Sequence, residues 1–201
     1  MCVVTPDVTL ATSHPSVPFS QRFETQSLGH SRSLAIREAT ASDAETWARS
    51  WLPLLSNTRA DDLNWDWARE IDRSEHEDGF VCFAVVSDAG PEGLMSLSIS
   101  TSRLAPPNGI VYIEYLAAAP WNRKDLQASR YAGIGTLLIE AAFRVSFAVG
   151  LSGRIGLHSK RQAESFYRDK LGLVDLGPEM TEDGEWVYFE ATPEVARKKL
   201  S

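Results

Sequence analysis

The chain alternates between apolar and polar residues, or runs apolar throughout, in seven short stretches. This pattern predicts strands at 33–37, 80–86, 93–100, 110–116, 154–158, 173–176 and 185–190. Apolar residues recur at helical spacing between these stretches, over 61–73, 134–148 and 163–172 and after a cap at Thr40 or Ser42. The order of elements predicts an α/β fold with a mixed sheet of about seven strands.

The first two predicted helices are rich in tryptophan and in acidic residues. Trp47, Trp51 and either Leu54 or Leu55 fall on one face of the first helix, and Leu63, Trp67 and Ile71 are spaced by four in the second. Residues 193–200 are predicted to form a short basic helix. Residues 1–32 are rich in Ser, Thr, Pro and Gln without a strand or helix period, so a loose extension is expected there.

The stretch 110–150 contains the strongest functional signal. An apolar strand ends before Pro120, and Arg130, Gly133 and Gly135 then precede an apolar helix. Glycines before a helix let the backbone approach an anion, which the first N–H groups of the helix can bind. A simple tight turn remains the alternative. A P-loop is excluded because Gly-Lys-Ser/Thr is missing, and a dinucleotide fingerprint is excluded because Leu138 occupies the position of the third glycine.

Length and composition indicate one globular domain, assigned to residues 33–192, with a tail at 193–201. The chain has 201 residues, 43% hydrophobic and 23% charged. Its net charge of −7 argues against sequence-independent binding of nucleic acid. With Cys2 and Cys82 alone, a disulfide framework is not expected. Neither a membrane-spanning run nor a secretory signal is visible, so we expect a cytoplasmic protein.

Three motifs in this order resemble the GCN5-related N-acetyltransferase (GNAT) superfamily over about residues 34–191. The pattern Leu-x-x-x-Pro at the strand end is matched by Leu116 and Pro120. The pyrophosphate loop Arg/Gln-x-x-Gly-x-Gly/Ala and the later pattern Ala-x-x-Phe-Tyr-x-x-Lys-x-Gly are also present; their matching residues are Arg130, Gly133, Gly135, Ala163, Phe166, Tyr167, Lys170 and Gly172. The resemblance implies a mostly antiparallel sheet with splayed central strands and direct acetyl transfer from acetyl-CoA to an amine, without a metal.

The resemblance also implies which residues hold acetyl-CoA. The pantetheine arm would lie along the central strand, and the pyrophosphate would bind at the loop; the implied residues are Leu116, Ala117, Ala118, Arg130, Tyr131, Ala132, Gly133, Ile134, Gly135 and Thr136. Two departures stand out. Residues 121–129 form an insertion in which Arg123 or Lys124 is a candidate for phosphate contacts. Lys160 replaces an Asn common in the family, so Ser159 or Lys160 is the expected substitute for it.

Transfer to an amine needs an acid for the departing thiolate and, for a basic acceptor, a base. The acceptor must be neutral to attack. Deprotonating a lysine-like amine at pH 7, about three pKa units below its pKa, costs roughly 4.6 kcal/mol, whereas deprotonating an α-amino group costs about 1 kcal/mol. Tyr167, at the position of the family's tyrosine, is the predicted acid, with core packing as the alternative. Glu114, an acid within an apolar strand, is the predicted base, with a solvated or ion-paired acid as the alternative. His158 and Cys82 are read as structural.

The resemblance also implies that the acceptor lies near the first two helices and their linker. Aromatic faces beside carboxylates in that region would suit a cation. The residues concerned are Trp47, Trp51, Trp65, Trp67, Asp61, Asp62, Asp66, Glu70 and Asp72. The simpler reading makes the tryptophans core and the acids a solvated face. A small-molecule amine and a protein amine are both kept as acceptors, and a silent acyl-CoA-binding module or a transferase of longer acyl groups are the rival functions. Many relatives form dimers, and homodimer formation stays open because no feature requires it.

Overall fold

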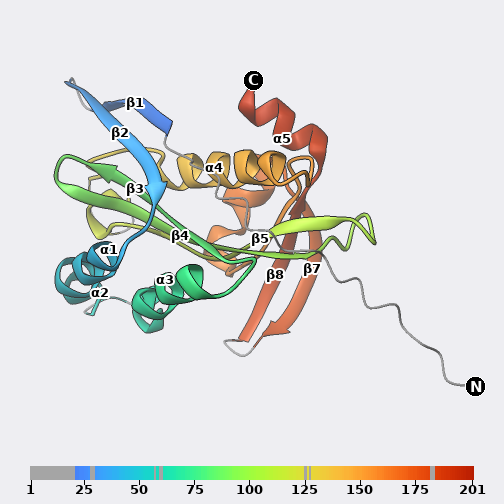
Figure 1. Cartoon of the computed structure of the whole chain (residues 1–201), viewed down its shortest axis with the longest axis horizontal. Helices are drawn as coiled ribbons and strands as arrows, with labels where there is room; N and C mark the ends of the chain where they lie inside the picture. Colours follow the sequence, from blue (N-terminus) through green and yellow to red (C-terminus); the bar gives the residue numbers. More distant parts are fainter. Residues whose placement is uncertain are drawn as a thin grey trace, which may run out of the picture.

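A computed structural model describes residues 21–27, 30–56, 58, 61–124, 126, 128–181 and 184–201. Within these ranges, eight strands form one twisted sheet (Figure 1). The strands are β1 (Gln21–Ser27), β2 (His30–Glu38), β3 (Val81–Ser87), β4 (Gly90–Thr101), β5 (Gly109–Ala118), β6 (Ile155–Ser159), β7 (Val174–Thr181) and β8 (Gly184–Ala191).

The sheet is mixed and mostly antiparallel, as predicted. Its order is β1-β2-β3-β4-β5-β6-β8-β7. The central pair β5 and β6 is parallel, because the chain returns from β5 to β6 through a crossover helix, and every other neighbouring pair is antiparallel. A parallel pair requires such a crossover, so the long helix between these strands fixes the topology.

Helices cover both faces of the sheet (Figure 1). The α-helices are α1 (Ala41–Thr46), α2 (Leu52–Leu55), α3 (Trp67–His76), α4 (Ile134–Ala148) and α5 (Pro193–Leu200). Short 3-10 helices are η2 (Asp61–Asn64), η3 (Pro120–Asn122) and η4 (Arg161–Ala163), and π-helical turns are η1 (Trp47–Trp51) and η5 (Phe166–Leu171). Helices α4 and α5 lie on one face, and α1 to α3 lie on the other.

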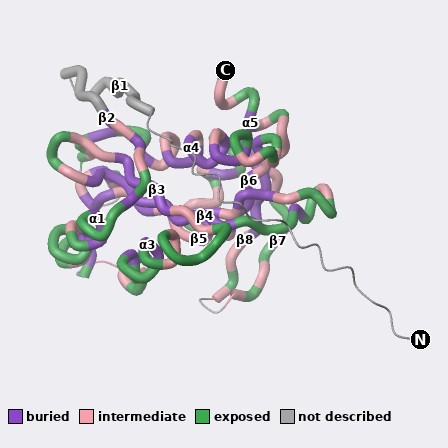
Figure 2. The backbone as a smooth tube through the Cα atoms, in the orientation of Figure 1, coloured by how far each residue is buried: buried purple, intermediate pink, exposed green. Residues whose placement is uncertain are grey.

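Each face has its own apolar core, and the buried residues concentrate along the central strands (Figure 2). The α4 core contains Leu138 and Phe143 against Val111 and Leu157. The α1–α3 core is built around Trp51 and Trp67, which are 0% and 1% exposed. Large apolar side chains removed from water contribute about 25 cal/mol per Å², so these two cores hold the sheet between its helices.

The structure of residues 40–55 settles which residue caps α1 and which leucine completes its apolar face. Thr40 is the N-cap, and a capping box joins it to Asp43. Asp43 also accepts two hydrogen bonds from the Arg37 guanidinium, at 2.7 and 2.9 Å. Leu55 is fully buried, whereas Leu54 is 55% exposed, so Leu55 completes the apolar face with Trp47 and Trp51.

Two boundaries differ from those predicted from the sequence. Residues 21–27, within the expected loose extension, form β1 at the sheet edge, where backbone pairing needs no hydrophobic period; residues 1–20 lie outside the described part. The expected helix over 61–73 is interrupted, because Asp66 caps a new helix by accepting from the Arg69 N–H. The short helix predicted over 193–200 is present as α5 in the tail, and its Ala196 is fully buried in the α4 core. Across the described ranges, no helix has the length and apolar character needed to cross a membrane.

Candidate active site

A cavity of about 260 Å³ opens where the two central strands separate. Strands β5 and β6 pair only over Val111–Ile155, Tyr112–Gly156 and Ile113–Leu157, although β5 continues to Ala118. The cavity occupies the divergence between them, so the predicted splay is present. Its lining residues are Asp62, Trp65, Ile113, Glu114, Leu116, Ala117, Ala118, Arg123, Leu157, His158, Ser159, Lys160, Gln162, Ala163, Tyr167 and Trp186.

The predicted pantetheine segment, Leu116 to Ala118, lines this cavity. On its other side each of these residues pairs with β4, Leu116 with Met95 and Ala118 with Gly93. Because β6 has already diverged, the β6 side of this segment faces the cavity. An extended ligand can bind there as an added strand, which is a common way for backbone groups to hold a linear partner.

The glycine loop places the start of α4 beside η5. Gly133 is the N-cap with φ of 85°, a left-handed conformation that favours glycine. The first intrahelical bond found here runs from the Leu137 N–H to the Gly133 carbonyl, at 3.0 Å. The N–H groups of Ile134, Gly135 and Thr136 therefore belong to the helix start, where an anion can accept from them. A Cβ atom on Gly133 would meet no atom within 4 Å, so the loop is open at this position.

Two predicted loop amides already have protein partners. The Arg130 N–H donates to the Trp121 carbonyl at 2.9 Å, and the Tyr131 N–H donates to Asn122 Oδ1 at 2.9 Å. The Tyr131 side chain is buried in the core. The Arg130 guanidinium lies 3.7 Å from a Glu92 oxygen and over the Trp121 ring. Of the predicted anion donors at 130–136, the amides of residues 132–136 therefore stay the candidates, together with the half-exposed Arg130 side chain.

Tyr167 lies in η5 and lines the cavity next to this helix start. Its side chain is 9% exposed and contacts Phe166 and Phe189. Burial raises the pKa of Tyr167 to about 12, so the phenol keeps its proton at neutral pH. The neighbouring Phe166 reaches within 3.8 Å of the position where a Gly135 Cβ would lie. Gly172, with φ of 77°, ends η5 and directs the chain into β7.

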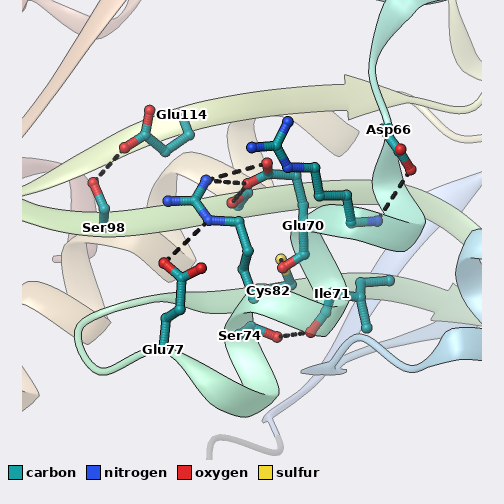
Figure 3. Close-up of polar contacts among 11 residues, drawn as sticks. Asp66, Glu70, Ile71, Ser74, Glu77, Cys82, Ser98 and Glu114 are labelled. Atoms are coloured by element: carbon teal, nitrogen blue, oxygen red, sulfur yellow. Dashed lines mark hydrogen bonds and ion pairs between the residues drawn. The ribbon is translucent and has the colours of Figure 1, made fainter.

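Glu114 occupies a bulge in β5. Tyr115 pairs with Ser96 and Ile113 pairs with Leu97, so Glu114 has no partner of its own in the ladder. Bulges redirect side chains and occur often beside active sites. The Ser98 hydroxyl donates to Glu114 Oε1 at 2.6 Å (Figure 3). Burial raises the pKa of Glu114, and the nearby Glu70 adds to this effect while Ser98 and Arg73 oppose it.

Glu70, on α3, lies near Glu114 (Figure 3), and both Glu70 and Arg73 act electrostatically on Glu114. Glu70 is 6% exposed, accepts from the Ser96 hydroxyl at 2.9 Å and pairs with Arg73 at 3.3 Å. Ser96 and Ser98 follow each other on the same side of β4, so both carboxylates are held by one strand. The sequence analysis missed these serines, although two serines at strand spacing within an apolar stretch are a readable signal.

His158 lines the cavity and Cys82 is buried, and for both a structural role stays a prediction. The Tyr112 hydroxyl lies 2.6 Å from His158 Nδ1, and His158 Nε2 lies 3.0 Å from Glu179. Burial lowers the pKa of His158, and Arg103 adds to this. The Cys82 thiol donates to the Glu70 carbonyl, and burial raises its pKa to about 11. A buried neutral thiol is a poor nucleophile.

The acceptor region combines core and cavity residues. Trp47, Trp51 and Trp67 are core, as the simpler reading expects, whereas Trp65 lines the cavity. Asp62 and Glu70 are buried rather than solvated, at 4% and 6% exposure. Asp62 accepts two hydrogen bonds from Arg123, at 2.9 and 3.2 Å, so Arg123 forms part of this wall. The Asp61 side chain lies outside the described part of the structure. Asp66 caps α3, and Asp72 is exposed.

The two residues considered as substitutes for the family Asn both line the cavity. The Ser159 hydroxyl is buried and donates to the Lys160 carbonyl at 3.0 Å. The Lys160 ammonium lies 4.7 Å from the centre of the Trp186 ring. Trp186, on β8, was not singled out from the sequence, because its strand comes into the cavity only through its pairing with β6. Among the described residues, no group of three or more metal-binding side chains is found.

The fold is similar to that of solved acetyltransferase structures. No protein-family model matches the chain, and no curated protein matches it. The aminoglycoside acetyltransferase AAC(6')-Ib, solved with coenzyme A and kanamycin, has a TM-score of 0.57 at 19% identity and covers 84% of this chain and 99% of its own. The PaiA N-acetyltransferase of Thermoplasma acidophilum, solved with coenzyme A, has 0.53 at 18%, covering 79% and 98%.

A third structure carries the family name itself. The acetyltransferase of the GNAT family from Streptococcus pneumoniae has a TM-score of 0.51 at 19% identity and covers 79% of this chain and 98% of its own. At such identities the likeness concerns the arrangement of the backbone, and it agrees with the splayed parallel pair and the helix that crosses between its strands. The resemblance expected from the sequence is thus confirmed at the level of structure: the chain has the fold of the GCN5-related N-acetyltransferases.

Proposed function

We propose that the chain is an acetyl-CoA-dependent N-acetyltransferase, which moves the acetyl group directly to an amine of a small molecule or protein. The observation that carries the proposal is the meeting of three features at one cavity: the splayed edge of β5, Tyr167 beside the α4 start, and the bulged Glu114. Structural neighbours solved with coenzyme A support the cosubstrate. Coenzyme A supplies an activated acyl group as a thioester.

Binding of acetyl-CoA uses backbone groups. Amides of residues 132–136 would hold the pyrophosphate, and the β5 segment Leu116–Ala118 would hold the arm and polarise the thioester carbonyl. Donors that are fixed before the reaction stabilise developing charge without reorganisation. Ser159, at the end of β6, lies on the opposite wall of the cavity and is the third proposed contact.

Two side chains manage the protons. Glu114 accepts a proton from the incoming ammonium, directly or through water, so that the neutral nitrogen forms the new bond to the acetyl carbon. The bond from that carbon to sulfur breaks, and Tyr167 donates its proton to the departing thiolate. The acylated nitrogen loses its remaining extra proton to water and becomes a neutral amide. Tyr167 then recovers a proton from solvent, and Glu114 releases its proton to solvent. A phenol with a pKa of about 12 is protonated at rest and is therefore ready to donate.

The decisive test is release of free thiol from acetyl-CoA across a panel of amines and peptides, with Tyr167→Phe as the key variant. A lost general acid costs about 100-fold or more in kcat, while calorimetric binding of coenzyme A should be unchanged. Tyr188→Phe is the matched control, because Tyr188 is a buried tyrosine that bonds Glu190 outside the cavity. No turnover by the native chain, with coenzyme A still bound, would instead favour a silent acyl-CoA-binding module.

A further inference from the structure

The insertion, residues 121–129, is anchored by a buried carboxylate at its start. Glu92 is 1% exposed and accepts from Trp121 Nε1 at 2.5 Å and Asn122 Nδ2 at 2.7 Å. The Trp121 ring packs edge-on against Trp51, with centroids 6.0 Å apart. A charged acceptor in the protein interior makes strong hydrogen bonds with such donors. The first residues of the insertion are therefore fixed against the body of the domain.

Arg123, the next residue, joins this anchored segment to the opposite wall of the cavity. Its Nη1 atom contacts both oxygens of Asp62, in η2, at 2.9 and 3.2 Å. The two side chains are 24% and 6% exposed, and both line the cavity. Removing one partner of such a pair leaves an uncompensated charge in a poorly solvated place. Each residue therefore controls the charge that its partner presents to the cavity.

The charged groups that line the cavity are balanced. Two are acidic, Asp62 and Glu114, and two are basic, Arg123 and Lys160. Asp62 is held by Arg123, whereas Glu114 is held by a neutral hydroxyl, Ser98. An ammonium that enters can therefore be neutralised at Glu114. A second ammonium on the same molecule would face the Arg123 cation at the Asp62 wall, and like charges repel strongly where water is scarce.

We propose that the Asp62–Arg123 ion pair sets acceptor specificity: it masks Asp62, so that the cavity takes small amines with one positive charge and discriminates against amines with two. This inference rests on the proposed acetyltransferase function and narrows its acceptor. The insertion then belongs to the acceptor wall rather than to the phosphate site. The pair is the specificity-determining element, while Glu114 receives the reacting amine.

The test compares n-butylamine with 1,4-diaminobutane, which have the same chain length and differ by one charge. The measured quantity is the ratio of kcat/KM for diamine over monoamine, followed by thiol release. Arg123→Met unmasks Asp62 and should raise this ratio about tenfold, equivalent to roughly 1.4 kcal/mol. Asp62→Asn should lower it, and combining both changes should abolish the gain. Arg123→Lys keeps the charge and should stay near the native ratio.

Arg197→Ala is the matched control, because its partner Glu194 forms an exposed pair on α5, outside the cavity. The gain in Arg123→Met should also shrink in high salt, since it is electrostatic. An unchanged ratio in Arg123→Met and Asp62→Asn, with butylamine still acetylated, overturns this inference alone. Absence of thiol release with every amine and every variant overturns the proposed function, and this inference with it. Should Arg123→Met not fold, Asp62→Asn provides the same comparison with the opposite sign.

Discussion

The face of the sheet under α4 and the face under α1 to α3 are both well buried, but different chemistry fills them. Under α4 the contacts are apolar, from Leu138, Phe143 and their partners in β5 and β6. Under α1 to α3 the tryptophan core is accompanied by buried carboxylates, Asp43, Asp62 and Glu70 among them. Each of these three is held by an arginine.

The difference matches the two halves of the proposed reaction. The α4 side offers an anion backbone N–H groups at a helix start, a device that depends on chain conformation and tolerates many side chains. The α1–α3 side offers an amine paired charges whose strength depends on particular residues far apart in the chain. In this proposal the α4 side binds the cofactor through its backbone, and the charged side chains of the α1–α3 side determine which amine is accepted.

The largest effect should come from Glu92, whose carboxylate joins β4 to the insertion. Glu92→Ala leaves the Trp121 and Asn122 donors without their acceptor, and breaking a buried charged network typically costs about 3 kcal/mol. Denaturant unfolding at neutral pH measures this loss. Glu194→Ala, an exposed acid on α5, should change the unfolding free energy by less than about 0.5 kcal/mol. Equal losses in both variants would mean that Glu92 does not anchor the insertion.

Glu114 tests the acceptor half of the comparison through activity. Glu114→Gln keeps the shape but cannot accept a proton, and the loss of a general base should lower kcat about 100-fold for a strongly basic amine. Because the pKa of Glu114 is raised above its ordinary value of 4.5, native activity should fall as pH drops through that raised pKa. This acidic limb should be absent in the variant.

A weak acceptor sharpens the same prediction. An aromatic amine is neutral at pH 7 and needs no base, so Glu114→Gln should slow its acetylation far less than that of an alkylamine. Equal losses for both acceptors would assign Glu114 to structure. Ser98→Ala, which removes the hydrogen bond at 2.6 Å, should shift the acidic limb to higher pH, since that bond favours the charged carboxylate.

The smallest effect should come from the cofactor half. Gly133→Ala places a Cβ at φ of 85°, a strained conformation that costs about 1 kcal/mol, although no atom obstructs it. We expect coenzyme A to bind roughly five- to tenfold more weakly by calorimetry, equivalent to about 1 to 1.4 kcal/mol. Gly79→Ala, at φ of 82° in an open turn far along the chain from the loop, is the matched control and should leave the affinity unchanged.

The sequence by itself determined most of the fold and the position of the glycine loop proposed to hold the cofactor. Hydrophobic periods located the central strand, the long crossover helix and the last hairpin, because local burial patterns repeat with the geometry of each element. The edge strand β1 was not predicted, because Phe23 is the one large apolar residue among its seven. The start of α3 at Trp67, after its cap Asp66, was also not predicted. In the sequence, a capping aspartate within a polar segment cannot be told from any other exposed acid.

Only the tertiary structure determined the orientation and the ion-pair partners of the side chains on the proposed acceptor side. The bulge that aims Glu114 comes from a register shift between two strands, which no local pattern encodes. The Asp62–Arg123 pair joins residues 61 positions apart, and Arg123 had been considered for phosphate because its sequence neighbourhood suggested that alone. A turn or a helix start depends on neighbouring residues and can be predicted from the sequence. The role of a charged side chain depends on the partner that folding places beside it.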